Sequence, residues 1–507
     1  MALNITDILG LQGLTTGQGA ENLIAAYGND YHIWNPVLNS WDGQGIITAE
    51  LTKVRSTVFL DKAFFVNGNN NNVRRYDGVL ELWQDETAVK KAPMAEDVKQ
   101  VGDRVYYAGV YFNNLNFRSK VWYSDLPKNN DLTYGLEYGT DLTQIEGSAY
   151  VRSASSYFKA RNIKVGDPFF ISTGGNIGEY NVQSIEDEKT IVLTEQLKTT
   201  VMGSNFWVGG NYVDVNTNDG DALTGIGENR GRKLFFKKHA LYVYNDVSLK
   251  PIDGVPGTSS RDTIVNIGSY TYYFNQYGIW RTDGANSILI SRSLQEYLDG
   301  IPATFFDETI AWKAGPSLEK YRVFVGDISN INADIEIERC YLEFDTITEE
   351  CSVGQLPFYP TARTIFSETK LEKVFLGNTD SEIHQTDVGN DDNGDAIPFM
   401  AETGWHFPAG AENEIIITKA EVHCREGSGI SFQYKLYGTP NTQEKQWHGL
   451  TDVKDTVTTI DLTGRENNNI GRGINIQFKS NDIDKPPIIE RIDIIWRPIT
   501  KRKIDNE

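Results

Sequence analysis

Cysteine, histidine and methionine are scarce in this chain, which has 3, 6 and 4 of them among 507 residues. The cysteines are Cys340, Cys351 and Cys424, with no CxxC pair, and their odd, low number favours reduced thiols in a protein assembled in the cytoplasm. No apolar run approaches the roughly 18 residues that a membrane-spanning helix needs, so we expect no membrane span. The first residues have neither a basic segment nor a long apolar core, so we also expect no signal peptide.

Sequence motifs that carry chemistry are lacking as well. The chain has no GxSxG, P-loop or HExxH motif, and no GxGxxG that follows a strand. The best metal candidate is the acidic stretch Asp387–Asp395, but an EF-hand loop placed there would begin at Gly389 and close on Met400, neither of which ligates calcium through its side chain. His423 and Cys424 are neighbours on a predicted strand and point to opposite faces, which disfavours a shared zinc ion. We therefore predict no catalytic residue, no metal and no cofactor, and a protein that is not an enzyme.

Positive charge is in short supply. The chain has 48 lysines and arginines against 69 aspartates and glutamates, a net charge of −21. A protein that grips nucleic acid carries a basic footprint, which this chain as a whole does not have. An acidic wall would let DNA slide past without sticking, and an ordinary acidic surface explains the charge equally well.

Glycine and aromatic residues are plentiful, with 46 Gly, 25 Tyr, 23 Phe and 10 Trp, and this composition is typical of turn-rich β structure. The stretch 257–301 shows the pattern best, because tight turns separate four short apolar or aromatic strands at 264–268, 270–274, 278–282 and 287–290. One such sheet cannot bury both of its faces alone, so it predicts sister sheets and is typical of one blade of a β-propeller. The capping-box pair Ser293 and Glu296, with Gly300 as a stop, predicts a short helix after it.

Similar units recur along the chain at a spacing of roughly 35–45 residues, which suits propeller blades. They begin near residues 51, 97, 221, 257, 310 and 361. Five or six blades are visible in the sequence, and the blade number stays open.

The repeat pattern stops in two places, and these breaks predict the domains. Residues 140–220 contain four or five short strands in a compact segment, which indicates a small β-barrel inserted into a propeller loop. After residue 395 the strands are longer and alternate strictly, which predicts a C-terminal β-sandwich of jelly-roll type. The expected all-β architecture is therefore an N-terminal arm (1–20), a propeller in two parts (21–139 and 221–395), the inserted barrel (140–220) and the sandwich (396–507).

The segment after the arm has two interpretations. Residues 22–27 and 31–34 flank a Gly28–Asp30 turn and predict a hairpin that supplies outer strands to the last blade and closes the ring. Ala20, Leu23, Ile24 and Tyr27 also fit one face of a helix.

One basic stretch is a candidate interface. Five cations alternate with the aromatic residues of a predicted strand: Arg230, Arg232, Lys233, Lys237 and Lys238. Basic and aromatic residues together can hold single-stranded nucleic acid, but this strand needs its aromatics for the core. We therefore predict a rim patch that contacts an acidic loop of a neighbouring subunit, such as 186–188 or 387–395.

Several segments and the order of the parts resemble one protein family. The segments are Gly225–Arg230, Leu241–Tyr244, Asp262–Tyr270, Ile290–Leu298 and the closing strands 474–478 and 492–496. They resemble the tail hub or nozzle proteins of short-tailed bacteriophages, which include the packaged-DNA-stabilisation proteins. The resemblance covers most of the chain but not residues 140–220.

This resemblance implies a structural protein of the virion, assembled in the host cytoplasm. It implies a homo-oligomer, a hexameric ring below the portal or adaptor proteins, which continues the DNA channel, retains the DNA until ejection and anchors tail fibres or spikes. Genomic DNA would pass through the lumen without sequence-specific binding. The resemblance implies no catalytic residues, and it leaves open whether the tail is short or long.

The sequence also allows a function of a different class. A propeller with a lectin-like sandwich could bind or cleave glycans, with exposed Trp34, Trp405 or Trp447 stacking on sugar rings. A glycan-binding or glycan-cleaving propeller is therefore the alternative hypothesis.

Overall fold

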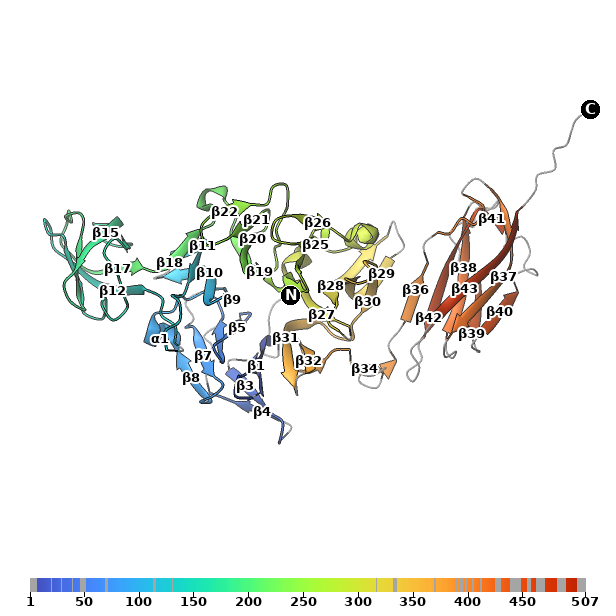
Figure 1. The fold of residues 1–507 in the computed structure, drawn as a ribbon, viewed down its shortest axis with the longest axis horizontal. Helices are drawn as coiled ribbons and strands as arrows, with labels where there is room; N and C mark the ends of the chain where they lie inside the picture. Colours follow the sequence, from blue (N-terminus) through green and yellow to red (C-terminus); the bar gives the residue numbers. More distant parts are fainter. Residues whose placement is uncertain are drawn as a thin grey trace, which may run out of the picture. The chain divides into compact units, whose positions relative to one another are not determined.

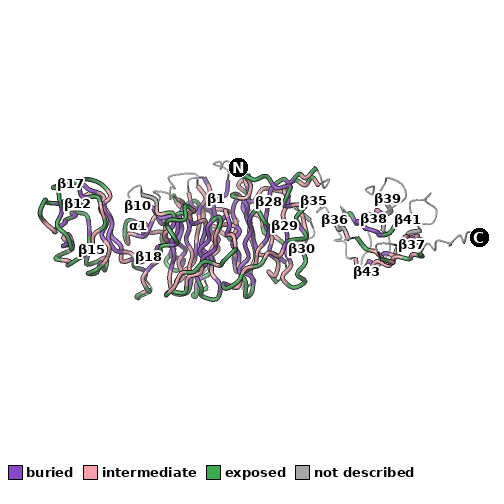
Figure 2. The backbone as a smooth tube through the Cα atoms, turned by 90° about the horizontal axis from the view of Figure 1, so that it is seen from above, coloured by how far each residue is buried: buried purple, intermediate pink, exposed green. Residues whose placement is uncertain are grey.

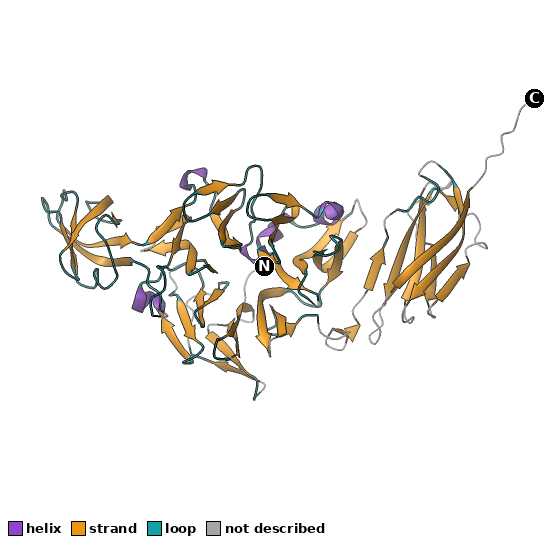
Figure 3. Ribbon diagram, in the orientation of Figure 1, coloured by secondary structure: helices purple, strands orange, loops and turns teal. Residues whose placement is uncertain are grey.

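A computed structural model describes residues 7–498, except 20, 29, 39, 46–51, 69–71, 113–114, 130, 316, 332–334, 369–370, 388–390, 393–394, 397–398, 404, 411–412, 425–429, 438–447, 454–456, 462–469 and 481–488. Strands dominate it, so the all-β prediction is confirmed (Figure 3). The chain divides into two compact units, Met1–Asp387 and Val388–Glu507. None of the described helices has the length and apolar character of a membrane-spanning helix.

Among the described residues of the first unit, seven small antiparallel sheets stand around a common axis in a propeller-like ring (Figure 1). The first three sheets contain β1 (Ile8–Thr15), β2 (Glu21–Tyr27), β3 (Asp30–Asn35) and β4 (Ser40–Gly43); β5 (Arg55–Phe59), β6 (Lys62–Val66), β7 (Arg74–Asp77) and β8 (Leu82–Asp85); and β9 (Asp97–Val101), β10 (Arg104–Phe112), β11 (Leu115–Tyr123) and β18 (Asn211–Asp214).

The other four sheets follow in chain order. They contain β19 (Leu223–Asn229), β20 (Arg232–Lys237), β21 (Leu241–Tyr244) and β22 (Leu249–Pro251); β23 (Val265–Ile267), β24 (Tyr270–Asn275), β25 (Gly278–Thr282) and β26 (Ser287–Leu289); β27 (Ile310–Ala314), β28 (Lys320–Asn330), β29 (Ile335–Asp345) and β30 (Cys351–Gln355); and β31 (Pro360–Glu368), β32 (Leu371–Asn378) and β33 (Ile383–Gln385).

Helical segments are short and lie between strands. They are α1 (Glu86–Lys90), α2 (Gln295–Leu298) and the 3-10 turns η1 (Thr217–Asp219), η2 (Arg261–Thr263), η3 (Arg292–Leu294) and η4 (Ala303–Asp307). The helix predicted after the fifth sheet is present as η3 and α2. The N-cap of α2 is Leu294, and no side chain caps α2. The predicted capping box of Ser293 and Glu296 is therefore wrong.

Strand alternation explains why the sheets stand face to face. Successive side chains of β24 point to opposite faces, so Tyr272 packs against Tyr321 of the sixth sheet while Tyr273 packs against Phe236 of the fourth. All three tyrosines are buried. Each sheet thus covers its two faces with its two neighbours. In Figure 2, buried backbone runs along the strands of this unit, and exposed residues gather at the turns.

The ring closes between its first and last sheets. Thr361 on β31 donates its hydroxyl to the Ile8 carbonyl (2.8 Å), and the Gly13 amide donates to the Thr364 hydroxyl (2.9 Å). The expectation of an extended arm over residues 1–20 is wrong for Ile8–Thr15, because these residues form β1, the innermost strand of the first sheet. The following residues form the strands β2 and β3 and not a helix, and they extend β1 into a sheet of its own instead of joining the last one.

A closed barrel is inserted between β11 and β18. Its strands, in order around the barrel, are β12 (Leu136–Gln144), β13 (Tyr150–Ser153), β16 (Thr190–Leu193), β15 (Gly178–Ile185), β14 (Pro168–Ile171) and β17 (Val201–Gly209). The predicted small barrel is thus present, but its strands run from 136 to 209 and not from 140 to 220. The segment from 211 to 214 leaves the barrel, because β18 pairs with β11, with Tyr212 opposite Trp122.

The second unit contains two four-stranded sheets. One consists of β36 (Phe399–Glu402), β42 (Gly473–Ser480), β38 (Ile430–Tyr437) and β39 (His448–Val453), and the other of β40 (Val457–Asp461), β37 (Ile415–Cys424), β41 (Ile470–Gly471) and β43 (Ile489–Pro498). A hairpin of β34 (Asp391–Asp392) and β35 (Asp395–Ala396) precedes them. Apolar side chains of β37, β38 and β42 form one buried cluster. The jelly-roll sandwich stays a prediction.

Ring closure predicts a strong effect of a side chain at Gly13. A Cβ atom there would lie 2.7 Å from the Ile365 carbonyl oxygen and 2.9 Å from Phe366 Cα, so the backbone of β31 would have to move. We expect Gly13→Ala to lower the free energy of unfolding by about 1–3 kcal/mol, measured by urea denaturation. Gly17→Ala is the control, since its Cβ would meet only Asp61 at 3.5 Å. Equal stability of the two variants would contradict this account of closure.

Candidate functional site

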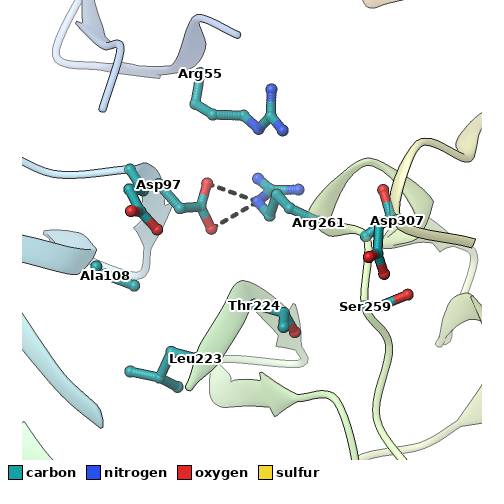
Figure 4. A pocket seen from close by; sticks show the side chains of 11 residues that line it. Arg55, Asp97, Ala108, Leu223, Thr224, Ser259, Arg261 and Asp307 are labelled. Carbon is teal, nitrogen blue, oxygen red and sulfur yellow. Dashed lines mark hydrogen bonds and ion pairs between the residues drawn. The ribbon is translucent and has the colours of Figure 1, made fainter. Parts of the chain in front are cut away.

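Two cavities lie at the axis of the ring. The larger, of about 330 Å³, is lined by residues of β1, β5, β9, β19, β23, β27 and β31, the innermost strand of every sheet. The smaller, of about 240 Å³, shares Arg55 and Arg261 with it. Figure 4 shows these two arginines extending into the same space. Because all seven sheets contribute to its wall, this lumen exists only in the closed ring.

Charged side chains gather at the lumen. We call seven of them the lumen cluster: Lys53, Arg55, Asp97, Lys99, Arg261, Asp262 and Arg363. They come from the segment that enters β5, from β9, from η2 and from β31. Side chains two residues apart on a strand share a face, which is why Asp97 and Lys99 lie on the same side of β9. With five cations and two carboxylates, the cluster is basic although the chain is acidic.

Asp97 and Arg261 form the first ion pair of the lumen cluster. Arg261 Nε lies 2.7 Å from both carboxylate oxygens of Asp97, as the dashed lines in Figure 4 indicate. Asp97 also accepts hydrogen bonds from the amides of Val98 and Ile226, each at 2.9 Å. The carboxylate therefore joins β9 to β19 of the next sheet and holds the guanidinium group of Arg261 in place.

Asp262 holds two more cations. Its Oδ2 atom lies 3.1 Å from Lys53 Nζ and 3.1 Å from a terminal nitrogen of Arg55. Burial alone would raise the pKa of the Asp262 carboxyl, but Arg55 and Lys53 together hold that pKa well below its usual range. Asp262 is therefore ionised at neutral pH and partly neutralises both cations.

Lys99 and Arg363 are left without such a partner. No described carboxylate oxygen lies within 4.0 Å of their charged nitrogens, and Arg363 Nη2 donates to the Ile264 carbonyl (3.0 Å). Burial, and after it the nearby Arg261 and Arg363, lower the pKa of Lys99 to about 8. Burial lowers the pKa of Arg363 to about 10, against the opposing effect of Asp262. Around the larger cavity, positive charge therefore exceeds what the lining carboxylates compensate.

The two cavities differ in charge. Acidic residues outnumber basic ones around the smaller cavity, where Glu96, Asp97 and Asp307 face Arg55 and Arg261. Around the larger cavity the balance is reversed, because it takes in Lys99 and Arg363 as well. The layer formed by Arg55 and Arg261 thus separates an acidic region of the lumen from a basic one.

The predicted interface residues do not form one patch. Lys233 is buried and lies 2.5 Å from the Asp246 carboxylate, and Lys237 is fully buried with Nζ at 2.7 Å from Asp219 Oδ1. Placing these two lysines on an exposed rim is wrong, because strand alternation turns both into the interior of the ring, where each meets a carboxylate of its own chain.

The other three predicted interface residues are exposed. Arg230 and Arg232 lie at the turn between β19 and β20, where Arg230 has a φ of 50°, and Lys238 lies just past the opposite end of β20. Arg232 also donates to the Gly284 carbonyl (3.2 Å). A contact of these three residues with another subunit stays a prediction.

Potential metal ligands meet on the second unit. Glu421 and His423 on β37 and Asp493 on β43 bring their ligand atoms within 4.8 Å of one another. Cations already occupy both carboxylates, since Lys419 Nζ lies 2.5 Å from Glu421 and Arg491 Nη2 lies 2.8 Å from Asp493. The group therefore forms an ion-pair network on the face of a sheet.

Two earlier metal candidates can be placed. His423 is half-buried while Cys424 is buried in the apolar cluster, so the predicted opposite orientation of these neighbours is confirmed. In the acidic stretch 387–395, Asp387 Oδ1 pairs with Arg322 at 2.7 Å. Residues 388–390 and 393–394 of that stretch lie outside the described residues.

The lumen cluster was missed in the sequence, although a signal was present. Strands that begin a repeat carry alternating charges in otherwise apolar surroundings, as in Lys53-Val-Arg55 and Asp97-Val-Lys99. A charge at alternate positions of a core strand indicates that one edge of the sheet faces a polar lumen.

No protein-family model and no curated protein matches this chain. Among solved structures it is similar to the phage phi92 endosialidase, with 10% identity and a TM-score of 0.28 over 90% of this chain and 73% of that one. It is also similar to a catalytically inactive virginiamycin B lyase from Staphylococcus aureus with quinupristin (8% identity, TM-score 0.37, 76% of this chain and 96% of that one). The selenomethionine form of that lyase gives 10% identity and a TM-score of 0.30 over 66% of this chain and 93% of that one. Since all three TM-scores are low, neither the fold nor the function of this chain follows from these likenesses.

The lowered pKa of Lys99 predicts a pH-dependent stability. Between pH about 8 and its ordinary pKa of 10.5, the unfolded chain holds a proton on Lys99 that the folded chain has released, so the contribution of Lys99 to stability rises with pH across this window. Lys99→Met should remove that rise and increase the free energy of unfolding at pH 7 by about 1–3 kcal/mol. Urea denaturation at pH 7 and pH 10 measures both effects. The exposed Lys250→Met is the control, and a loss of stability in Lys99→Met at pH 7 would refute the assignment.

Proposed function

We propose that this protein is a structural component of a bacteriophage virion, a tail hub or nozzle that assembles into a closed hexameric ring. The ring would continue the DNA channel below the portal and adaptor proteins, retain the DNA and anchor fibres or spikes. The sequence resemblance is the starting point for this proposal. The geometry of the inserted barrel supports it, as follows.

Apolar side chains remain exposed at one end of the barrel. Ile145, Ile177 and Met202 are 58%, 67% and 79% exposed. In the barrel, Gln144 pairs with both Val151 and Val201, which brings the β12–β13 turn and the start of β17 together. We call the end that bears Ile145, Ile177 and Met202 the barrel tip.

A buried asparagine fixes the third segment of the barrel tip. Asn176 Nδ2 donates to Gln144 Oε1 and to the Thr199 carbonyl, both at 2.6 Å, and its Oδ1 accepts from the amides of Lys198 and Thr199. Ile177 is therefore held beside the β12–β13 turn. At the opposite end of the barrel, Leu136 pairs with Gly209, where the chain enters and leaves the ring of sheets.

The barrel tip is the observation on which the proposal rests. A rigid module that presents exposed apolar side chains away from the ring that carries it is suited to contact another protein. A closed cyclic oligomer requires a heterologous interface, in which one surface of each subunit meets a different surface of the next. We assign the barrel tip to one side of that interface.

Two further features fit the proposed role. The net charge of −21 would disfavour adhesion of DNA phosphates to the wall of a subunit ring. The C-terminal unit, for which we propose a sandwich of jelly-roll type, adds a second module that could hold portal, adaptor or fibre proteins.

Assembly tests the proposal directly. Native mass spectrometry of the purified protein should detect a discrete hexamer, and the double variant Ile177→Glu, Met202→Glu should remain monomeric because its barrel tip carries charges that an apolar contact cannot accommodate. Val247→Glu is the matched control, since Val247 is 91% exposed on a turn of the ring of sheets. A wild-type protein that stays monomeric both alone and with portal, adaptor or fibre proteins would end the proposal.

Glycan binding or cleavage is the second candidate, and two aromatic pairs favour it, one half-buried and one exposed. Trp34 packs on Trp41 with ring centroids 5.3 Å apart, and Trp405 packs edge-on against Tyr437 at 5.5 Å. Both members of the second pair are exposed, at 38% and 43%. Trp447, the third candidate, lies outside the described residues.

A glycan array and an assay for released sugars separate the two functions. If the protein recognises glycans, Trp405→Ala should weaken binding on the array by about fivefold or more, because each stacked ring contributes on the order of 1 kcal/mol or more. The control is Tyr277→Ala, because Tyr277 is an exposed aromatic residue, whereas an aromatic residue such as Trp312 is buried. No retention of the wild-type protein by any glycan, and no sugar release, would rule out this candidate.

A further inference from the structure

The larger cavity of the lumen carries more positive than negative charge. Its lining contains five cations and two carboxylates: Arg55, Lys99, Arg261, Lys313 and Arg363 against Glu228 and Asp262. This excess lies inside a chain whose net charge is −21. Like charges in a confined cavity repel more strongly than on an open surface, because less water screens them.

The ion pairs within the chain neutralise only some of these lining cations. Asp262 is shared by Lys53 and Arg55, and Asp97 binds Arg261. Glu228 Oε1 already accepts a hydrogen bond from the Gly231 amide (3.2 Å). No described carboxylate lies within 4.0 Å of the charged nitrogens of Lys99, Lys313 or Arg363, which leaves three of the five lining cations without an ion pair.

We propose that the larger cavity is a binding site for a phosphate group, held chiefly by Lys99 and Arg363 with Arg261 beside them. A phosphate group carries about 1.5–2 negative charges at neutral pH, which offsets most of the positive charge of Lys99 and Arg363. An arginine guanidinium donates two parallel hydrogen bonds to phosphate oxygens, and a lysine ammonium adds a compact point charge.

The size and position of the cavity define the ligand further. A volume of about 330 Å³ accommodates inorganic phosphate or a small phosphomonoester but not a nucleic-acid duplex. The innermost strands of all the sheets form the walls, so the fold holds these cations close together although they repel one another. A bound phosphate would neutralise them and remove that repulsion. Burial, together with the neighbouring Arg261, lowers the pKa of both Lys99 and Arg363, so an anion bound beside them would be favoured.

This site does not depend on the proposed role in a virion. A phosphate group inside one subunit would stabilise that subunit whether or not six of them form a ring. Assembly and phosphate binding are measured separately, so one proposal can fail without the other.

Calorimetric titration with inorganic phosphate at constant ionic strength and pH 7 tests the proposal, with the thermal unfolding midpoint as a second readout. We expect saturable binding with one phosphate per chain and a midpoint that rises with phosphate concentration. Lys99→Gln and Arg363→Gln should each weaken binding at least tenfold, since each removes a charged donor. Lys250→Gln, at an exposed position, is the control and should bind as the wild type does.

Ligand comparisons and stability make the outcome decisive. Tighter binding of glucose 6-phosphate than of phosphate would identify a phosphomonoester as the ligand, and the reverse would identify free phosphate. Lys99→Gln should be at least as stable as the wild type without ligand but should lose the stabilisation by phosphate. The proposal is overturned if phosphate does not bind saturably, if acetate binds equally well, or if both lumen variants bind as the wild type does.

Discussion

Each sheet of the ring is too thin to bury its own two faces, and this constraint shapes the first unit. A four-stranded sheet buries apolar side chains on both sides only when another sheet stands on each side of it. Tyr272 and Tyr273 make the point, since these neighbours in sequence pack against different sheets. The requirement is met for every sheet only if the first and last sheets also meet, which the hydrogen bonds between β1 and β31 achieve.

Closure creates the lumen as a by-product. Seven inner strands converge on the axis, and their alternating side chains cannot all be apolar where water enters. Asp97 and Asp262 bind Arg261, Arg55 and Lys53 there, and these pairs join residues that are distant in sequence. Because five cations and two carboxylates line the larger cavity, this part of the axis is basic in an acidic protein. The charge of Lys99 lowers the stability of the fold without ligand and favours the binding of an anion. Stability and ligand binding are therefore linked at this residue.

In the function we propose, the sheets hold the ring and the inserted barrel contacts a partner. Its own apolar cluster makes it compact, and the pairing of β18 with β11 returns the chain to the third sheet without breaking the ring. Ile145, Ile177 and Met202 lie on the barrel, so their exposure does not disturb the packing of the sheets in the ring. Removing or charging the barrel tip should alter association and leave the ring intact, which distinguishes it from Gly13 at the closure.

Local pattern was enough to predict the all-β class, the four strands of 257–301, the recurrence of similar sheets and the barrel in the middle of the chain, because strand alternation and turn residues are local properties. The pattern could not reveal that Ile8–Thr15 is an inner strand, since its partner β31 lies at the other end of the unit. It also misplaced Lys233 and Lys237, because their carboxylate partners are on neighbouring turns and only folding brings them together. The lumen cluster depended most on tertiary structure: its charges lie on four segments between residues 53 and 363, and only closure of the ring brings them to one axis.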